Sequence, residues 1–390
     1  MSMPRGALDT AGFLLAIAAL AACGSTAAPS PAKPTQSSPG APAPASASPA
    51  ASPLAASAAA KPAASAAASA GPAASGGPTV KVAVQGRPDQ AALELGIDRG
   101  YFKRQGLDIQ TVQITDGAQM VPSLSTNQVQ VGNGAPSVAL FNALNRGIDI
   151  RIVADYAHVG PKGDTTLSIL ARKDLMDSGA VKSMADLKGR TIALGATPGT
   201  VSDYIFQRAL DRDHVQASDM TVKYLPFPDT LTAMGSKSVD AGLLTEPLVT
   251  QALAKGIAKV LYPGGDLIPG TYLSVLQYSA DFATKQPDAA GRFMVAYLQG
   301  VRDYNDAFLD KKDRDAAIKL LTEHLSVKDP RVWETSGPEY IDPNGKVNVD
   351  DLKRQGEFFA QQGKLTAVPD FGKYLDASFA AAAVKQLGAR

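Results

Sequence analysis

The residues best suited to chemistry lie in four short segments rich in glycine, proline and small polar side chains. They are QGRPDQ (85–90), GNGAPS (132–137), GATPGTVSD (195–203) and LLTEP (243–247). Each follows a strand-like run and precedes a helical pattern, so each is expected to be a strand-to-helix loop. Glycines let backbone N–H groups come close to a ligand, and the helix N-termini that follow present unpaired donors. These segments therefore predict a binding site built on hydrogen bonds.

Residues of these loops, with three aromatic residues near strand ends, are the candidate ligand contacts. The aromatic side chains of Tyr156, His158 and Phe227 would supply flat walls, or else belong to the core. For Ser137, Thr200 and Glu246 the alternative is simple helix capping. The loop candidates are Gln85, Gly86, Asn133, Gly134, Pro136, Ser137, Thr197, Gly199, Thr200 and Glu246.

Catalytic and metal-binding motifs are missing from the sequence. It contains no G-x-S-x-G elbow, no Walker-type phosphate loop and no H-E-x-x-H pair, and GNGAPS lacks the third glycine of a dinucleotide fingerprint. The three histidines, His158, His214 and His324, are scattered, and the only cysteine is Cys23. We therefore predict no catalytic residue, no metal and no cofactor.

The overall charge argues against nucleic acid as a partner. Lysine and arginine number 38 against 37 acidic residues, so there is no cationic excess. With 390 residues and 45% hydrophobic content, the chain is long enough for two ordinary domains.

The first 23 residues have the pattern of an export signal. Arg5 precedes an apolar run at 11–22 that is too short for a permanent membrane span. The following LAAC, which ends at Cys23, resembles the lipobox of bacterial lipoproteins. That resemblance implies cleavage before Cys23, lipid attachment to its thiol, and an extracytoplasmic chain anchored to the cell membrane. The alternative is an ordinary secretory signal.

Residues 24–78 are predicted to be a disordered tether. They consist almost wholly of alanine, serine, proline and glycine, and Leu54 is the only large aliphatic residue. Such a composition cannot form a core, and the prolines interrupt every helix. A coil of this length reaches roughly 40 Å, enough to hold a globular body off a membrane.

The remainder of the chain predicts an α/β fold with two similar lobes and mainly parallel sheets. Two stretches, 127–153 and 237–261, each contain a strand, a turn with proline, a helix and an Ala-Leu-x-x-Gly-Ile sequence before the next strand. Pro136 and Pro247 suit the first helical turn, and Gly147 and Gly256 suit the left-handed position after the helix. Strands are expected in the runs 79–86, 107–114, 129–134, 149–156, 190–196, 220–227, 238–244 and 257–264.

Three ranges are predicted for these lobes. Residues 79–174 form the first part of lobe 1, residues 175–270 form lobe 2, and residues 271–390 return to lobe 1 and end in helices. One apolar helix face there contains Phe293, Tyr297 and Val301.

Three motifs resemble a known family. LELGIDRGYFKRQGLDIQTVQI (93–114), SMADLKGRTIAL (183–194) and VDAGLLTEP (239–247) are similar to signatures of the solute-binding proteins for aliphatic sulfonates, taurine, nitrate and thiamine precursors, the NMT1-like group. The resemblance implies a type II periplasmic-binding-protein fold, in which crossover strands join two lobes that enclose a ligand. It also implies an ABC permease as partner, and we expect a monomer.

Ligand class and alternative functions stay open from the sequence. The ligand is expected to be a sulfonate, pyrimidine, flavin or aromatic acid, and Glu246 would suit a ligand with donor groups. One alternative is an enzyme on the same scaffold, either hydrolytic or like the pyrimidine synthases, whose cysteine-rich motif is missing here. Another alternative is a receptor that presents its ligand to a membrane kinase.

Overall fold

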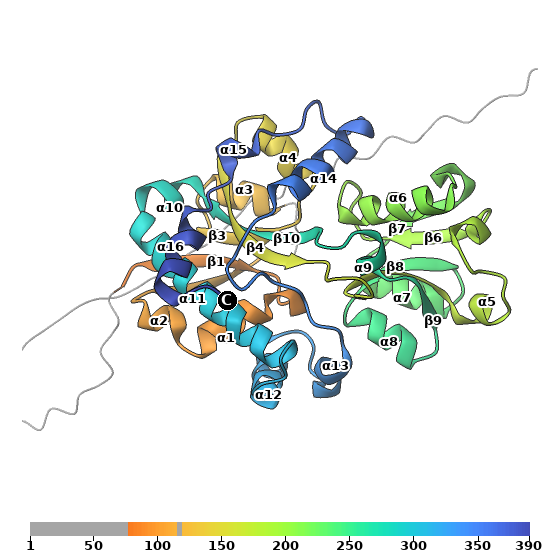
Figure 1. Cartoon of the computed structure of the whole chain (residues 1–390), viewed down its shortest axis with the longest axis horizontal. Helices are drawn as coiled ribbons and strands as arrows, with labels where there is room; N and C mark the ends of the chain where they lie inside the picture. Colours follow the sequence, from red (N-terminus) through yellow and green to blue (C-terminus); the bar gives the residue numbers. More distant parts are fainter. Residues whose placement is uncertain (1–76, 115–118) are drawn as a thin grey trace, which may run out of the picture. The chain divides into compact units, whose positions relative to one another are not determined.

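The computed structural model describes residues 77–114 and 119–390 of the chain. Two five-stranded sheets organise it, with orders β2-β1-β3-β10-β4 and β7-β6-β8-β5-β9 (Figure 1). We call the part built on the first sheet lobe 1 and the part built on the second lobe 2. The predicted signal peptide, Cys23 and the predicted tether up to residue 76 lie outside the described residues.

The strands follow the β-branched runs of the sequence. Lobe 1 contains β1 (Thr79–Val84), β2 (Asp108–Gln113), β3 (Val131–Gly134), β4 (Ile150–His158) and β10 (Tyr272–Ser279). Lobe 2 contains β5 (Leu167–Arg172), β6 (Thr191–Leu194), β7 (Thr221–Tyr224), β8 (Ala241–Thr245) and β9 (Ala258–Tyr262).

The helices lie between these strands and after the last one. Those before β10 are α1 (Ala91–Asp98), α2 (Tyr101–Arg104), α3 (Met120–Ser125), α4 (Val138–Asn145), α5 (Lys173–Asp177), α6 (Val201–Asp213), α7 (Phe227–Gly235), α8 (Leu248–Ala254) and α9 (Gly264–Leu267). Those after it are α10 (Ala280–Lys285), α11 (Pro287–Phe308), α12 (Arg314–His324), α13 (Pro330–Thr335), α14 (Val349–Gln361), α15 (Phe371–Tyr374) and α16 (Ser378–Leu387). Short 3₁₀ turns are η1 (Pro88–Gln90), η3 (Met184–Leu187) and η4 (Ala217–Asp219).

The α/β fold class and the two similar lobes are confirmed, and the sheets are mixed. In each sheet the first three strands pair in parallel, as β2-β1-β3 and as β7-β6-β8. The fourth strand, β10 or β5, is antiparallel to both of its neighbours. The expected strand runs omitted both of these crossover strands. The run LSILAR (167–172) is buried at its first five positions, as in a strand covered on both faces, so it has no alternation of apolar and polar residues that would indicate a strand.

The position of strand β5 differs from the predicted lobe boundaries. It lies within 79–174, which the sequence assigned to lobe 1, yet it pairs with β8 and β9 in the second sheet. Gly147 and Gly256 have φ of 81° and 62°, the expected left-handed conformation after a helix. Pro136 and Pro247 lie just before the first turn of α4 and α8, because Ser137 and Pro247 itself are the N-caps.

The long helix α11 anchors the core of lobe 1. Phe293, Tyr297 and Val301 are fully buried, as their spacing predicts. Gly300 lets α11 approach α1 closely, since a Cβ at Gly300 would lie 2.3 Å from the carbonyl oxygen of Ala92. This close packing fixes the position of α1, the helix that follows the loop after β1.

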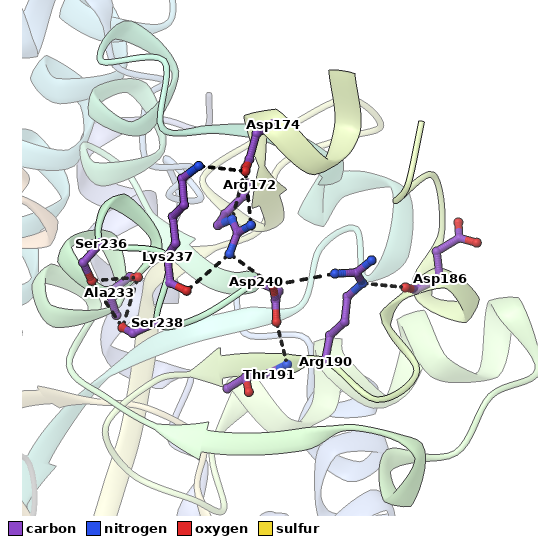
Figure 2. A network of polar contacts seen from close by, with 10 residues as sticks. All are labelled: Arg172, Asp174, Asp186, Arg190, Thr191, Ala233, Ser236, Lys237, Ser238 and Asp240. Carbon is purple, nitrogen blue, oxygen red and sulfur yellow. Dashed lines mark hydrogen bonds and ion pairs between the residues drawn. The ribbon is translucent and has the colours of Figure 1, made fainter. Parts of the chain in front are cut away.

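An ion-pair network lies at the end of the second sheet where β6 and β8 begin (Figure 2). The Asp240 carboxylate accepts from the backbone N–H of Thr191 at 3.0 Å and from the Arg172 guanidinium at 3.2 Å. Arg172 also pairs with Asp174. Because one carboxylate joins the starts of β6 and β8 to the end of β5, it holds three strands of lobe 2 in register.

We expect Asp240→Ala to lower the free energy of unfolding by about 1–3 kcal/mol, since the Thr191 N–H loses its side-chain acceptor and the Arg172 guanidinium keeps only Asp174 and the Lys237 carbonyl oxygen. Urea denaturation of the purified chain measures the change. The control is Asp211→Ala, which removes an exposed pair with Arg208 and should cost less than about 0.5 kcal/mol. Equal losses in the two variants would contradict the role of Asp240.

Candidate functional site

Two of the predicted loops, one from each lobe, are in direct contact. The backbone N–H of Val138, at the start of α4, donates to the carbonyl oxygen of Gly199 at 2.9 Å. Gly199 has a φ of 80°, and a Cβ on it would lie 2.9 Å from the Val138 side chain. Ser137 caps α4 and Thr200 caps α6, so the capping alternative holds for both hydroxyl groups. The loops GNGAPS and GATPGTVSD thus meet across the boundary between the lobes.

The N-terminus of α6 is occupied by a carboxylate of the chain itself. Asp203 is buried and accepts from the Gly199 N–H at 2.7 Å and from the Tyr224 hydroxyl at 2.8 Å. The ammonium group of Lys364 donates to the same carboxylate at 2.8 Å. Lys364 follows α14, and its carbonyl oxygen accepts from Asn142 of α4 at 3.3 Å. The end of α14 therefore links α4 of lobe 1 to α6 of lobe 2.

In the loop after β1, three backbone N–H groups donate to one side chain, that of Gln90. The Gln90 Oε1 accepts from the backbone N–H groups of Gln85, Gly86 and Arg87. The Asp89 carboxylate, 9% exposed, accepts from the Arg87 guanidinium at 2.6 Å. Its other oxygen, Oδ1, is buried and has no hydrogen-bond partner among the described residues.

Glu246, a candidate ligand contact in the sequence analysis, lies at the boundary between the lobes. Its carboxylate accepts from the Thr250 N–H and the Thr250 hydroxyl, both at 3.1 Å, and from Thr165 at 3.4 Å. Burial raises the pKa of Glu246, and hydrogen bonds from Thr250 and the Gly337 N–H oppose that shift. Pro88 of lobe 1, Glu246, Pro247 and Glu339 line one cavity of about 20 Å³, the size of a single water.

Glu339 is a site residue that the sequence reasoning missed. Burial raises its pKa from 4.5 to about 8, and the charge of Asp89 adds to the shift, while Arg87 opposes it. The Glu339 Oε2 atom is buried without a partner. The same segment touches lobe 2, because the Pro338 carbonyl oxygen accepts from the Thr166 hydroxyl at 3.1 Å. The only signal in SGPEYIDPNGK (336–346) was its turn composition, which does not distinguish a site loop from a connection.

Tyr156, on β4 of lobe 1, lies close enough to Asp89 and Glu339 for their charges to act on it. Its side chain is 2% exposed and stacks on Tyr297 with ring centroids 6.0 Å apart. Burial raises the pKa of Tyr156 well above 10, and the charges of Asp89 and Glu94 act in the same direction. Its hydroxyl has no hydrogen-bond partner among the described residues. We call Arg87, Asp89, Tyr156, Glu246 and Glu339 the cleft cluster.

His158 lies elsewhere, in a cavity of about 400 Å³ shared with Tyr340, Asp342 and Arg390. Its Nδ1 lies 2.7 Å from the buried Asp155 carboxylate, which also accepts from the Asp342 N–H at 2.7 Å. Partial burial alone would lower the pKa of His158, but the hydrogen bond and charge of Asp155 outweigh it and raise the pKa. His158 is therefore an anchor for the segment that contains Glu339.

The remaining predicted ligand contacts lie in or next to the loops after β3, β6 and β7. Asn133 is buried and donates to Ser274 at 3.2 Å, and the Gly134 carbonyl oxygen accepts from Gln277 at 3.4 Å. Phe227 begins α7 and packs beside Gly195 in lobe 2. Pro136 is buried, whereas Thr197 is exposed.

Two α/β lobes with crossover strands, and strand-to-helix loops that meet between them, define the architecture of a two-lobed binding protein. Residues 87–306 match the family described as NMT1/THI5 like. The chain belongs to this family, which confirms the resemblance seen in its motifs.

Known relatives agree with that assignment. A candidate aliphatic sulfonates-binding protein of Escherichia coli K12 is 26% identical over 73% of this chain and 85% of its own length. The solved aliphatic sulphonate binding protein SsuA of Escherichia coli has a TM-score of 0.62 at 21% identity, covering 76% of this chain and 91% of its own. The nitrate-binding protein NrtA of Synechocystis PCC 6803 has a TM-score of 0.65 at 14% identity, covering 80% of this chain and 89% of its own. These relatives are binding proteins, in agreement with the expectation that this chain is not an enzyme.

No helix in 77–114 or 119–390 is long and apolar enough to cross a membrane. In the same residues, no group of three histidine, cysteine or acidic side chains is placed to hold a metal ion.

The raised pKa of Glu339 predicts a pH dependence of stability. Because the folded chain keeps the proton up to about pH 8 and the unfolded chain loses it near 4.5, this group makes the free energy of unfolding fall as pH rises between these values. Glu339→Gln removes that dependence, so the stability difference between variant and wild type should change steadily across this window. Thermal unfolding at pH 4 to 9 measures it, with the exposed Glu357→Gln as control. Parallel profiles for wild type and Glu339→Gln would contradict the assigned shift.

Proposed function

We propose that this chain is the extracytoplasmic solute-binding component of an ABC importer, which captures a small organic ligand between its two lobes. The observation that carries the proposal is the direct contact of strand-to-helix loops from both sheets, above all Val138 with Gly199. In open α/β sheets, ligands bind beyond the carboxyl ends of the strands, where such loops converge. Membership of the NMT1/THI5-like family and the binding-protein relatives support the same role.

The proposal includes a membrane anchor, an ABC permease as partner and a monomeric chain. The LAAC sequence ending at Cys23 supports lipid attachment, and the tether composition would let the lobes reorient above the membrane. For the ligand, the named relatives suggest a sulfonate or nitrate, while pyrimidines, flavins and aromatic acids were also expected from the sequence.

Closure of the lobes has a natural reporter in Trp333, the single tryptophan. Its side chain is 7% exposed and lines the same cavity as Glu246 and Pro247 of lobe 2. Separation of the lobes would bring water to the indole. We expect a bound solute to reduce quenching of Trp333 fluorescence by acrylamide and to raise the melting temperature of the full chain. The proposal fails if a broad screen of small organic solutes changes neither property.

A matched pair of glycine variants isolates the contact between the lobes. Gly199→Ala places a Cβ against Val138, so we expect greater acrylamide quenching of Trp333 and about tenfold weaker solute binding. Gly189→Ala is the control, because Gly189 has a similar φ of 72° but open space around its Cβ position. An equal response in the two variants would mean that backbone strain alone explains the result.

The anchor is tested in living cells with Cys23→Ser. We expect wild-type chain in the membrane fraction and labelled by a fatty-acid analogue, because the Cys23 thiol is the predicted point of lipid attachment and processing depends on it. The variant should lose the label and accumulate unprocessed. An unlabelled wild-type chain released into the soluble fraction would instead identify an ordinary secretory signal.

A further inference from the structure

The backbone donors expected to receive an anion are already used within the chain. At α6 the Gly199 N–H donates to Asp203, and at α4 the Val138 N–H donates to the Gly199 carbonyl oxygen. In the loop after β1, three consecutive N–H groups donate to Gln90. An anionic ligand would have to displace these internal acceptors, one of which is itself a buried carboxylate. The helix N-termini of this cleft are therefore poor anion sites.

The cleft cluster has unused hydrogen-bonding atoms, and most of them are acceptors. Asp89 Oδ1 and Glu339 Oε2 are buried without partners, and the Tyr156 hydroxyl, which can also accept, has none. Asp89 and Tyr156 are more than nine-tenths buried. The Gln90 Nε2 of the same loop is an unpartnered donor, and the Tyr156 hydroxyl can donate as well as accept. Buried polar groups without partners cost free energy, so a ligand that supplies donors would relieve that cost.

Negative charge also exceeds positive charge at this point. The Glu339 carboxyl interacts with the charges of Asp89, Asp164 and Glu246, against the single cation Arg87. Arg87 already pairs with Asp89, and its side chain is 60% exposed. Since Asp164 and Glu246 have internal donors, the unsatisfied negative potential of the free chain lies at Asp89, and Glu339 adds to it only when it loses its proton. Such a field attracts cations and repels small anions.

We propose, on the basis of the solute-binding function above, that the ligand is a small organic cation of the ammonium, amidinium or guanidinium class. Its N–H groups donate to Asp89 Oδ1 and Glu339 Oε2, with the Tyr156 hydroxyl as a further partner. The lobes must move apart to admit it, because the cavity beside Glu246 and Glu339 has the volume of a single water. The segment 336–340 reaches lobe 2 at Thr166 and Glu246, so binding of Glu339 to the ligand couples recognition to contact between the lobes. This ligand class differs from the sulfonates and nitrate bound by relatives, because the carboxylates of this chain would repel such anions.

Binding of the cation releases a proton from Glu339. The free chain holds that carboxyl protonated near neutral pH, and an adjacent cation favours its carboxylate form. Affinity should therefore rise with pH, by up to about tenfold per pH unit below pH 8. The groups that face Glu339 and are able to modify this response are Arg87, Asp89, Tyr156, Asp164 and Glu246.

The test uses the full chain and probes matched in shape but not in charge. Benzamidinium is compared with neutral benzamide and with benzenesulfonate, and methylguanidinium with ethanesulfonate, by thermal shift and calorimetry. We expect the cations alone to raise the melting temperature and to release protons, as shown by a dependence of the binding heat on the buffer. Glu339→Gln should abolish the proton release, and Asp89→Asn should weaken binding at least about tenfold. The exposed Glu357→Gln should change neither.

The outcomes separate this inference from the proposed function. Stabilisation by benzenesulfonate, ethanesulfonate or nitrate but by neither cation would overturn the cation class and leave a solute-binding protein. Cation binding that is unchanged in Glu339→Gln and Asp89→Asn would overturn the assigned site. If no cation binds, the inference is wrong, and the broader Trp333 screen decides independently whether the chain binds a solute at all.

Discussion

The exchange of strands between the two sheets is the constraint on which the rest of this structure depends. Strand β5 is delivered to the second sheet after β4, and β10 returns to the first sheet after β9. Each is antiparallel to both neighbours, so the chain passes between the lobes through the interior of both sheets. This connection makes it possible for parallel strands β1, β3, β6 and β8 to present their following loops to one another. The Val138–Gly199 contact and the shared cavity at Pro88 and Glu246 are its consequences.

On such a scaffold, the polar groups that lack partners within the chain determine which ligands a binding cleft can hold. Here the backbone donors are satisfied by Gln90, Asp203 and a carbonyl oxygen, and the side-chain acceptors are left over. The same fold in a relative could have the opposite balance without any change in topology, because loops change more readily than the sheets that support them. Fold and family therefore identify a binding protein, and the loop side chains decide what it binds.

The sequence was sufficient for the parts of the fold that repeat a local pattern. Alternating β-branched runs predicted β1 to β4 and β6 to β9, and the spacing of Phe293, Tyr297 and Val301 predicted the buried face of α11. It was not sufficient for β5, because the sequence LSILAR, buried at its first five positions, does not alternate between apolar and polar residues. The lipid anchor and tether remain predictions, since they lie outside the described residues.

The candidate site was partly predictable for a physical reason. Loops that follow parallel strands can be placed from the chain order alone, so Gly134, Ser137, Gly199 and Glu246 could be assigned to one region. Glu339 could not, because it comes from a segment about 90 residues beyond Glu246 that has no strand before it. It reaches the cleft only because Asp155 and His158, at the end of β4, bind the following residues Asp342 and Tyr340 through their backbone. The buried pair of Asp155 and His158 thus helps to place the Glu339 carboxyl group between the lobes. A contact between residues so far apart in the sequence cannot be predicted from local sequence patterns.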